Sequence, residues 1–256
     1  MFSSTMPGTE PPLMRVSEFE RFLAEGEGER DFAAGGTRLT SLAPSVLQDL
    51  QRFAVKDVPG EIGSLEALEV MAAAVRHARP LLLHVQHERH VLPLTVFPAD
   101  RLVHCPLNPV TFLSERRITG LRVLHVEPAR MPSRAEQTDE VEARQYLPLG
   151  PLLWALALHG SREELLPEIA GTAAYRVVPG ADLAGLELSG TLAAAVHRLR
   201  RQTTNLREMS SWPGFDRGRA MRLLNGLYLH AALMVSRTHP AATNEGWFSG
   251  SQGQAR

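Results

Sequence analysis

A run of predicted helices near the carboxyl end, residues 190–240, constrains the fold more than any other part of this 256-residue chain. Apolar residues at helical spacing place a first helix at Leu192–Arg201. Asn205 and Glu208 then form a capping box, in which each side chain can satisfy a free backbone N–H at the start of a second helix. With the long helix that follows, these helices predict a helix-turn-helix or winged-helix unit.

The third helix of this run is the longest. It follows a turn at Trp212-Pro213-Gly214, and Asp216 caps its first turn, so we expect it to extend to about Met234. At 100° per residue, one stripe of small and aliphatic side chains faces the core. This stripe consists of Ala220, Leu223, Leu224, Leu227, Ala231 and Met234.

The other side of the third helix carries the candidate binding residues, which are Arg217, Arg219, Arg222, Asn225 and Leu229. Arg219, Arg222 and Asn225 form a ridge three residues apart, and Leu229 is expected to point outward as well. Basic residues on an exposed helix can enter a DNA groove. Exposed apolar residues can instead contact another protein, including a second copy of this chain. The sequence therefore allows both a DNA partner and a protein partner.

Basic charge is concentrated in this helical unit. Between residues 190 and 222 there are seven arginines against two acidic residues, a local charge of +5, whereas the whole chain has a formal net charge of −1. The local charge suits phosphate contacts, while the balanced total excludes a chain that binds polyanions by bulk electrostatics. The alternative interpretation is an ordinary arginine-rich helical surface.

The first half of the chain predicts an α+β domain in which helices precede a mostly antiparallel meander. Helices are expected at Ser17–Ala24, Pro44–Phe53 and Ser64–Val75, and Pro80 ends the last of them. Short runs rich in β-branched and aliphatic residues follow. The four predicted strands are Leu81–Gln86, His90–Phe97, Asp100–Cys105 and Leu121–Pro128.

Proline adds a constraint at two places. Pro93 lies inside the second predicted strand, which should therefore be at a sheet edge or contain a bulge. Beyond the meander, Leu147–His159 predicts an apolar helix, and Pro167 interrupts or ends a further helix that begins at Ser161. A strand at Ala173–Val178 precedes the helical unit.

Composition sets the predicted domain boundaries. Residues 1–14 and 241–256 are rich in small and polar residues and predict disordered tails. Residues 131–145 are charged and lack an apolar period, which predicts a linker. This linker separates an α+β domain at 15–130 from a helical, winged-helix-like domain at 146–240.

Histidines gather in the predicted sheet and raise the question of a metal site. They are His84, His87, His90, His104 and His125, and Cys105 adjoins His104. Three imidazoles, or two with a thiolate, can hold zinc. His84 and His87, however, are three residues apart and face opposite sides of one strand. We therefore predict no metal and no cofactor. A metal-binding protein or an enzyme that uses this histidine-rich sheet is kept as an alternative.

Few features of the sequence bear on location or catalysis. A single cysteine, Cys105, excludes an intramolecular disulfide and suits a reducing cytoplasm. No apolar run reaches 18 residues, so we expect no contact with a membrane. No serine lies in a nucleophile-elbow setting, because Gly250–Gly253 falls in a predicted tail. The expectation is a cytoplasmic protein that is not an enzyme.

A family resemblance is carried by two stretches of the chain. SLEALEVMAAAVRHARPLLLHVQHERHVLPLTVFPADRLVHC resembles the PATAN-type (DUF4388) domain of bacterial response regulators and of gliding or pilus signalling scaffolds. NLREMSSWPGFDRGRAMRLLNGLYLHAALM is similar to the helix-turn-helix-like half of such proteins. The chain departs from that pattern in lacking a Thr-Gly after the first helix and a phosphoacceptor receiver domain. The resemblance implies a regulatory or adaptor role and assigns no catalytic residue.

The leading prediction is therefore a non-enzymatic bacterial regulatory or scaffold protein that acts through protein–protein contacts, with a protein partner or a homodimer. The first alternative is a winged-helix DNA-binding transcription regulator that uses the Arg219 ridge. The second is the metal-binding protein or enzyme built on the histidine-rich sheet.

Overall fold

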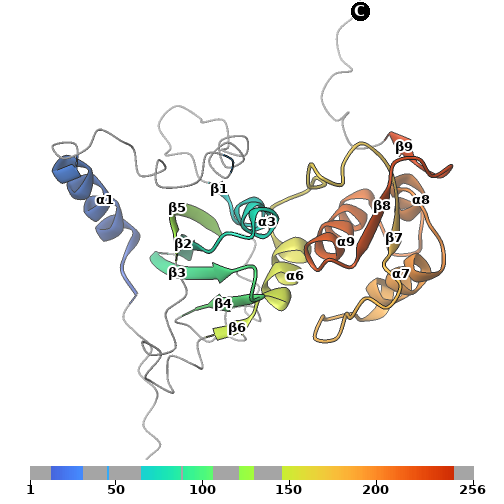
Figure 1. Ribbon diagram of the computed structural model, residues 1–256, viewed down its shortest axis with the longest axis horizontal. Helices are drawn as coiled ribbons and strands as arrows, with labels where there is room; N and C mark the ends of the chain where they lie inside the picture. Colours follow the sequence, from blue (N-terminus) through green and yellow to red (C-terminus); the bar gives the residue numbers. More distant parts are fainter. Residues whose placement is uncertain are drawn as a thin grey trace, which may run out of the picture. The chain divides into compact units, whose positions relative to one another are not determined.

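A computed structural model describes residues 13–30, 45, 65–87, 89–105, 121–129 and 146–244 of the chain. They form helices and antiparallel strands, and the chain divides into two compact units, Met1–Leu149 and Gly150–Arg256 (Figure 1). The expected mixture of helix and sheet is confirmed. None of the described helices is both long enough and apolar enough to cross a bilayer.

Several expectations lie outside the described residues. These are the linker at 131–145, the helix at 44–53 except for its residue 45, and most of the two tails. One strand, β9 (Thr243–Asn244), lies within the segment that composition assigned to the second tail.

The first unit is built on a six-stranded antiparallel sheet with the order β1-β5-β2-β3-β4-β6. Its strands are β1 (Leu65–Glu66), β2 (Leu81–His87), β3 (His90–Phe97), β4 (Leu102–His104), β5 (Arg122–Pro128) and β6 (Tyr146–Pro148). Leu81, Leu83 and Val85 alternate along β2 and are buried, so one face of this strand points into the core. The four predicted strands are confirmed as β2 to β5. Strand β6 joins this sheet although its residues were assigned to the second domain.

Pro93 shows how the sheet accommodates a residue without an N–H. Its strand β3 lies inside the sheet, and Pro93 itself pairs with His84 of β2 in a continuous register, so the expected edge or bulge is wrong. On the other side of β3, the N–H of Val91 bonds to Met14, and β4 pairs only with residues 95–97. Residues 91, 93 and 95 direct their amides to that same side. Pro93 therefore lies between the part of β3 that bonds to Met14 and the part that pairs with β4, and its missing N–H costs the sheet no hydrogen bond.

Two helices of the first unit differ from their predicted bounds. Helix α1 (Val16–Arg30) begins one residue before the predicted start at Ser17 and extends beyond Ala24; at its start the carboxylate of Glu18 accepts the Arg15 N–H at 3.2 Å. Helix α3 (Ala67–His77) starts three residues later than predicted, because Leu65 and Glu66 pair with β5 as a strand. Local helical periodicity could not report that cross-strand pairing.

The second unit contains four helices and three strands among its described residues. They are α6 (Leu149–His159), β7 (Thr172–Val177), α7 (Gly190–Arg201), α8 (Leu206–Ser210), α9 (Arg217–Leu229), β8 (Leu233–Ser236) and β9. Strand β7 lies between β8 and β9 in a small antiparallel sheet. The three predicted helices of the carboxyl-terminal run are present as α7, α8 and α9.

Helix α9 is shorter than predicted, ending at Leu229 instead of about Met234. Ala231 adopts a left-handed backbone with φ of 56°, and the N–H groups of Ala231 and Ala232 close the end of the helix on the carbonyls of Tyr228 and Leu227. The chain then pairs with β7 as β8. Ala231 and Met234, which were expected in the core, are exposed, because the helical spacing stops at Leu229: Ala231 lies in the turn that ends the helix and Met234 lies on β8.

The helix predicted from Ser161 is also wrong, since the described segment 161–171 forms turns. Its backbone groups bond to side chains elsewhere in the unit. The guanidinium of Arg237 donates to the carbonyls of Glu168, Ala170 and Thr172. Such bonds replace the intrahelical ladder around Pro167, whose ring has no N–H to offer.

Candidate nucleic-acid interface

The start of α8 is fixed by the Asn205 half of the predicted capping box; the reciprocal bond from the Asn205 N–H to the Glu208 carboxylate is not made. Asn205 Oδ1 accepts the Glu208 N–H at 2.8 Å, and its Nδ2 donates to the Ala241 carbonyl at 3.0 Å. The Glu208 carboxylate accepts from Gln202 Nε2 at 3.2 Å and lies 3.5 Å from a guanidinium nitrogen of Arg198. Asn205 and Glu208 therefore tie α8 both to the loop after β8 and to the end of α7.

The turn between α8 and α9 is equally defined. Asp216 Oδ1 accepts the Arg219 N–H at 2.6 Å and caps α9, which confirms the predicted start of this helix. Gly214 has φ of 74°, and a Cβ there would lie 2.7 Å from Thr191 Cγ2, so both conformation and space require glycine. Helix α8, this turn and α9 therefore follow one another in the order expected from the sequence.

Two arginines and two aromatic rings form a stack that connects α7 with α9, and we call it the cation–aromatic ladder. The Arg198 guanidinium lies 4.6 Å from the centre of the Trp212 ring system, and Trp212 meets Phe215 edge to face at 6.3 Å. The Arg219 guanidinium lies 5.4 Å from the Phe215 centroid. Both rings are buried and both arginines are exposed. Stacking uses the face of a guanidinium and leaves N–H donors at its edge for another acceptor.

The predicted site residues separate into exposed and buried groups along α9. Arg217 and Arg219 are exposed on the first turn, as expected. Arg222 is partly buried; its Nε donates to the Arg162 carbonyl at 3.4 Å, and its side chain lies 3.9 Å from Glu163. Arg222 therefore contributes more to holding the loop before β7 than to an open surface.

The expected outward positions of Asn225 and Leu229 are wrong. Asn225 is fully buried and binds the loop before β7, and Leu229 is only 2% exposed. The cause is that α9 is covered on more than one side: the loop lies over the side of Asn225, while Gly226 faces Trp154 of α6. A helical wheel assumes one buried stripe, and that assumption fails for the second half of α9.

Other arginines of the second unit serve the fold. Arg162 and Arg237 donate to backbone carbonyls of the loop before β7. Arg200 donates to the Ala181 carbonyl and receives Arg176 at its own carbonyl. Several arginines of this unit therefore stabilise the fold, and fewer arginines are available to a partner than the sequence contains.

Arg207 and the ladder residue Arg198 were not assigned to a site from the sequence. Arg207 is exposed on α8 and has no hydrogen bond or ion pair with any described residue. Its exposure on α8 follows from the same helical spacing that places Leu206 and Met209 in the core. The ladder contact of Arg198 joins residues 14 positions apart in different elements, so no local pattern signals it.

The histidine-rich sheet brings two imidazoles together. His84 and His125 are cross-strand partners with ring centroids 5.8 Å apart, and Phe19 of α1 stacks on His84 at 4.7 Å. His125 Nε2 lies 3.1 Å from the Glu127 carboxylate. In the part of the chain that the structure describes, no three His, Cys, Asp or Glu side chains are placed to hold a metal ion.

Comparisons with protein-family models, with curated proteins and with solved structures find no match to this chain.

Proposed function

We propose that the protein is a non-enzymatic regulatory protein and that its second unit is a winged-helix-like module that binds duplex DNA. The observation that carries the proposal is the pair of exposed arginines, Arg217 and Arg219, on the first turn of a well-capped second helix of a helix-turn-helix motif. In such motifs the amino-terminal residues of the second helix contact base edges, while the first helix crosses the DNA backbone. Arg207, which is exposed on α8, would make that backbone contact.

The burial of α9 supports the same use of the helix. Residues 223–227 and Leu229 are buried, so only the first two turns are open to a partner. The major groove of B-form DNA is about 12 Å wide and admits one helix end, whereas the major groove of A-form RNA is too narrow for side chains to read. Duplex DNA is therefore the nucleic acid that this arrangement fits.

A protein partner is the second candidate, and one observation favours it. Met234 is 47% exposed on β8, where an apolar side chain can contact another protein. The resemblance to signalling scaffolds points the same way. The argument from Leu229 no longer supports this candidate, because that side chain lies in the core.

Fluorescence anisotropy of the full chain with a labelled duplex of about 20 base pairs, two helical turns, tests the proposal. The double variant Arg217→Gln/Arg219→Gln should bind about tenfold more weakly or worse. The slope of log K against log salt should flatten by about 0.9 for each lost phosphate contact. Arg79→Gln/Arg89→Gln removes the same charge from exposed positions of the first unit and is the matched control.

The control variant should bind as the unmodified chain does. If both double variants lose affinity equally, the effect is one of net charge and the assignment to α9 is wrong. If the unmodified chain shows no salt-dependent binding between about 50 and 200 mM salt, DNA binding itself is refuted.

A further inference from the structure

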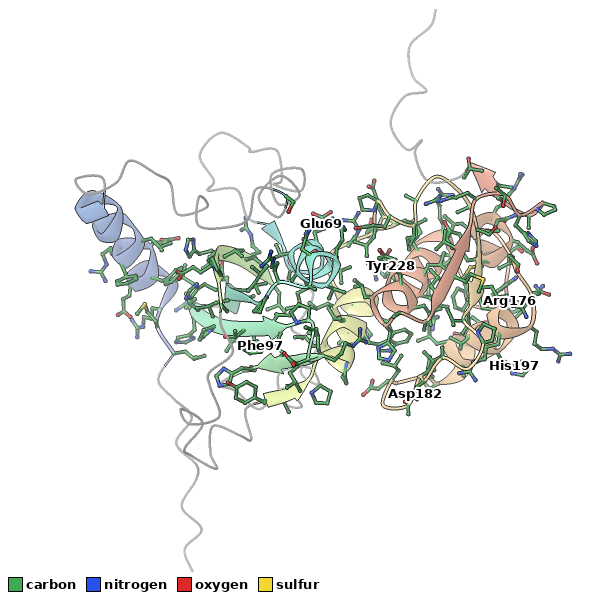
Figure 2. The ribbon with its side chains drawn as sticks, in the orientation of Figure 1. Glu69, Phe97, Arg176, Asp182, His197 and Tyr228 are labelled. Carbon is green, nitrogen blue, oxygen red and sulfur yellow. The ribbon has the colours of Figure 1, made fainter. Side chains whose placement is uncertain are left out.

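Helix α7 carries an exposed stripe of basic residues that the helix-turn-helix motif does not include. The basic residues His197, Arg198 and Arg201 are exposed, as is Ala194; Ala194 and Arg201 each lie three or four residues from both His197 and Arg198, so the four residues share one side of the helix. Ala195, Val196 and Leu199 form the buried side. No residue of α7 is acidic. We call the exposed side the α7 basic stripe; its central residue His197 is labelled in Figure 2.

The cation–aromatic ladder places this stripe beside the open end of α9. Arg198 belongs both to the stripe and to the ladder, whose other end is Arg219 on the first turn of α9. Since Trp212 and Phe215 are buried between these two arginines, the ladder fixes the spacing of α7 and α9. The two basic surfaces are thus parts of one rigid arrangement within the second unit.

The donors of the stripe can be used by a partner. Arg201 has no hydrogen bond or ion pair within the described residues and is exposed. Arg198 is paired with Glu208 at 3.5 Å, with both side chains more than 40% exposed (46% and 43%). An exposed pair of this kind contributes little to stability, so exchanging the Glu208 carboxylate for a phosphate costs little.

We propose that the α7 basic stripe is a second contact with the DNA, made to the phosphate backbone beside the groove that α9 enters. This inference rests on the proposed DNA binding and extends the footprint from α8 and α9 to α7. Arg198 and Arg201 are separated by about 4.5 Å along the helix axis. Phosphates of one DNA strand follow each other at about 3.4 Å along its axis, so two long side chains reach neighbouring phosphates. Guanidinium groups match phosphate in a planar, bidentate geometry.

Two single substitutions of opposite expected effect test the stripe, again by anisotropy with the labelled duplex of about two helical turns. Arg201→Gln should weaken binding about fivefold to tenfold and flatten the salt slope by about 0.9. Glu208→Gln should tighten binding, because it removes a negative charge and frees the Arg198 guanidinium. A gain of affinity cannot arise from misfolding, which makes this variant the sharper test. Arg79→Gln is the control for net charge.

The results separate this inference from the proposed function. If Arg217→Gln/Arg219→Gln abolishes binding while Arg201→Gln and Glu208→Gln change nothing, the stripe is not a contact and the footprint ends at α9. If neither α7 nor α9 substitutions matter, the proposed DNA binding is wrong as well. If the chain ignores the duplex but binds a poly-glutamate peptide in a manner that depends on Arg201, the stripe recognises an acidic protein segment and the inference is overturned.

Discussion

The buried side-chain amide of Asn225 allows a prediction about stability that depends on replacing a single atom, the Nδ2 donor. Its Oδ1 accepts the N–H of Leu166 at 2.9 Å, and its Nδ2 donates to the carbonyl of Glu164 at 2.8 Å. Asn225 and Leu166 are both fully buried. Asn225→Asp preserves shape and the acceptor, but it places a carboxylate oxygen against the Glu164 carbonyl and introduces a charge into the core.

The expected cost follows from those two changes. Losing a buried donor to a carbonyl costs about 1–3 kcal/mol, and an uncompensated buried charge raises the total to about 3–5 kcal/mol at neutral pH. Burial also raises the pKa of the introduced carboxyl in the folded state. Below the unfolded pKa of about 3.9 the carboxyl is protonated in both states, so the charge penalty is absent there. It grows by about 1.4 kcal/mol per pH unit as pH rises towards the folded pKa, and it is complete above that pKa.

Asn205 provides a matched control, because its amide also accepts one N–H and donates to one carbonyl. Asn205 is only partly buried and caps α8, where water solvates a carboxylate and the helix amino terminus favours it. Asn205→Asp should therefore cost less than about 1 kcal/mol and should not become worse as pH rises.

Urea unfolding monitored by tryptophan fluorescence measures both variants against the unmodified chain, because Trp154 and Trp212 are buried in the second unit. As the pH is lowered from 7 to 4.5, we expect the free energy of unfolding of Asn225→Asp to rise towards that of the unmodified chain. Equal stabilities of Asn225→Asp and Asn205→Asp, or a difference that is independent of pH, would refute the argument.

Two further predictions concern the packing of α9. In Gly226→Ala the new Cβ would lie 2.8 Å from Trp154 Cε3, so the substitution should destabilise the second unit by about 1–3 kcal/mol in the same urea assay. Gly218→Ala, whose Cβ meets nothing closer than Asp216 Oδ1 at 3.5 Å, should leave stability unchanged or raise it. Leu229→Glu should unfold the second unit, seen as lost circular dichroism, because it buries an unpaired carboxylate. Met234→Glu on the exposed side of β8 should stay folded, and a folded Leu229→Glu would show that Leu229 is not a core residue.

Features that depend on neighbouring residues were predictable from the sequence. Asn205 and Asp216 cap their helices as expected, because a cap involves groups only three residues apart. Strands β2 to β5 of the first sheet followed from short runs of β-branched and aliphatic residues, whereas β1 and β6 did not. The exposure of Arg217 and Arg219 also followed from their place on the first turn of α9.

Features that depend on distant segments were not predictable. Asn225 is buried because a loop 59 to 61 residues earlier in the sequence covers it, and no helical wheel contains that loop. Ala231 and Met234 continue the helical spacing, yet the helix ends at Leu229 and the chain from Leu233 onward pairs with β7 as a strand. Tertiary contacts decide between the two periods where the local pattern allows both.

The same long-range contacts determine where a binding surface can lie in the second unit. Because the second half of α9 is enclosed, this helix can offer a partner only its first two turns, which is a small footprint for stable binding. Arg162 and Arg237 add little to it, since both of them hold the loop before β7 through two or more bonds to backbone carbonyls, whereas Arg219 gives a single such bond, to the Gly214 carbonyl at 3.1 Å. The positive charge that remains on exposed side chains lies on α7, on α8 and at the start of α9, and the ladder makes α7 and α9 rigid with respect to each other. A polyanion that contacts α9 therefore meets α7 as part of the same surface, and the affinity should depend on both helices.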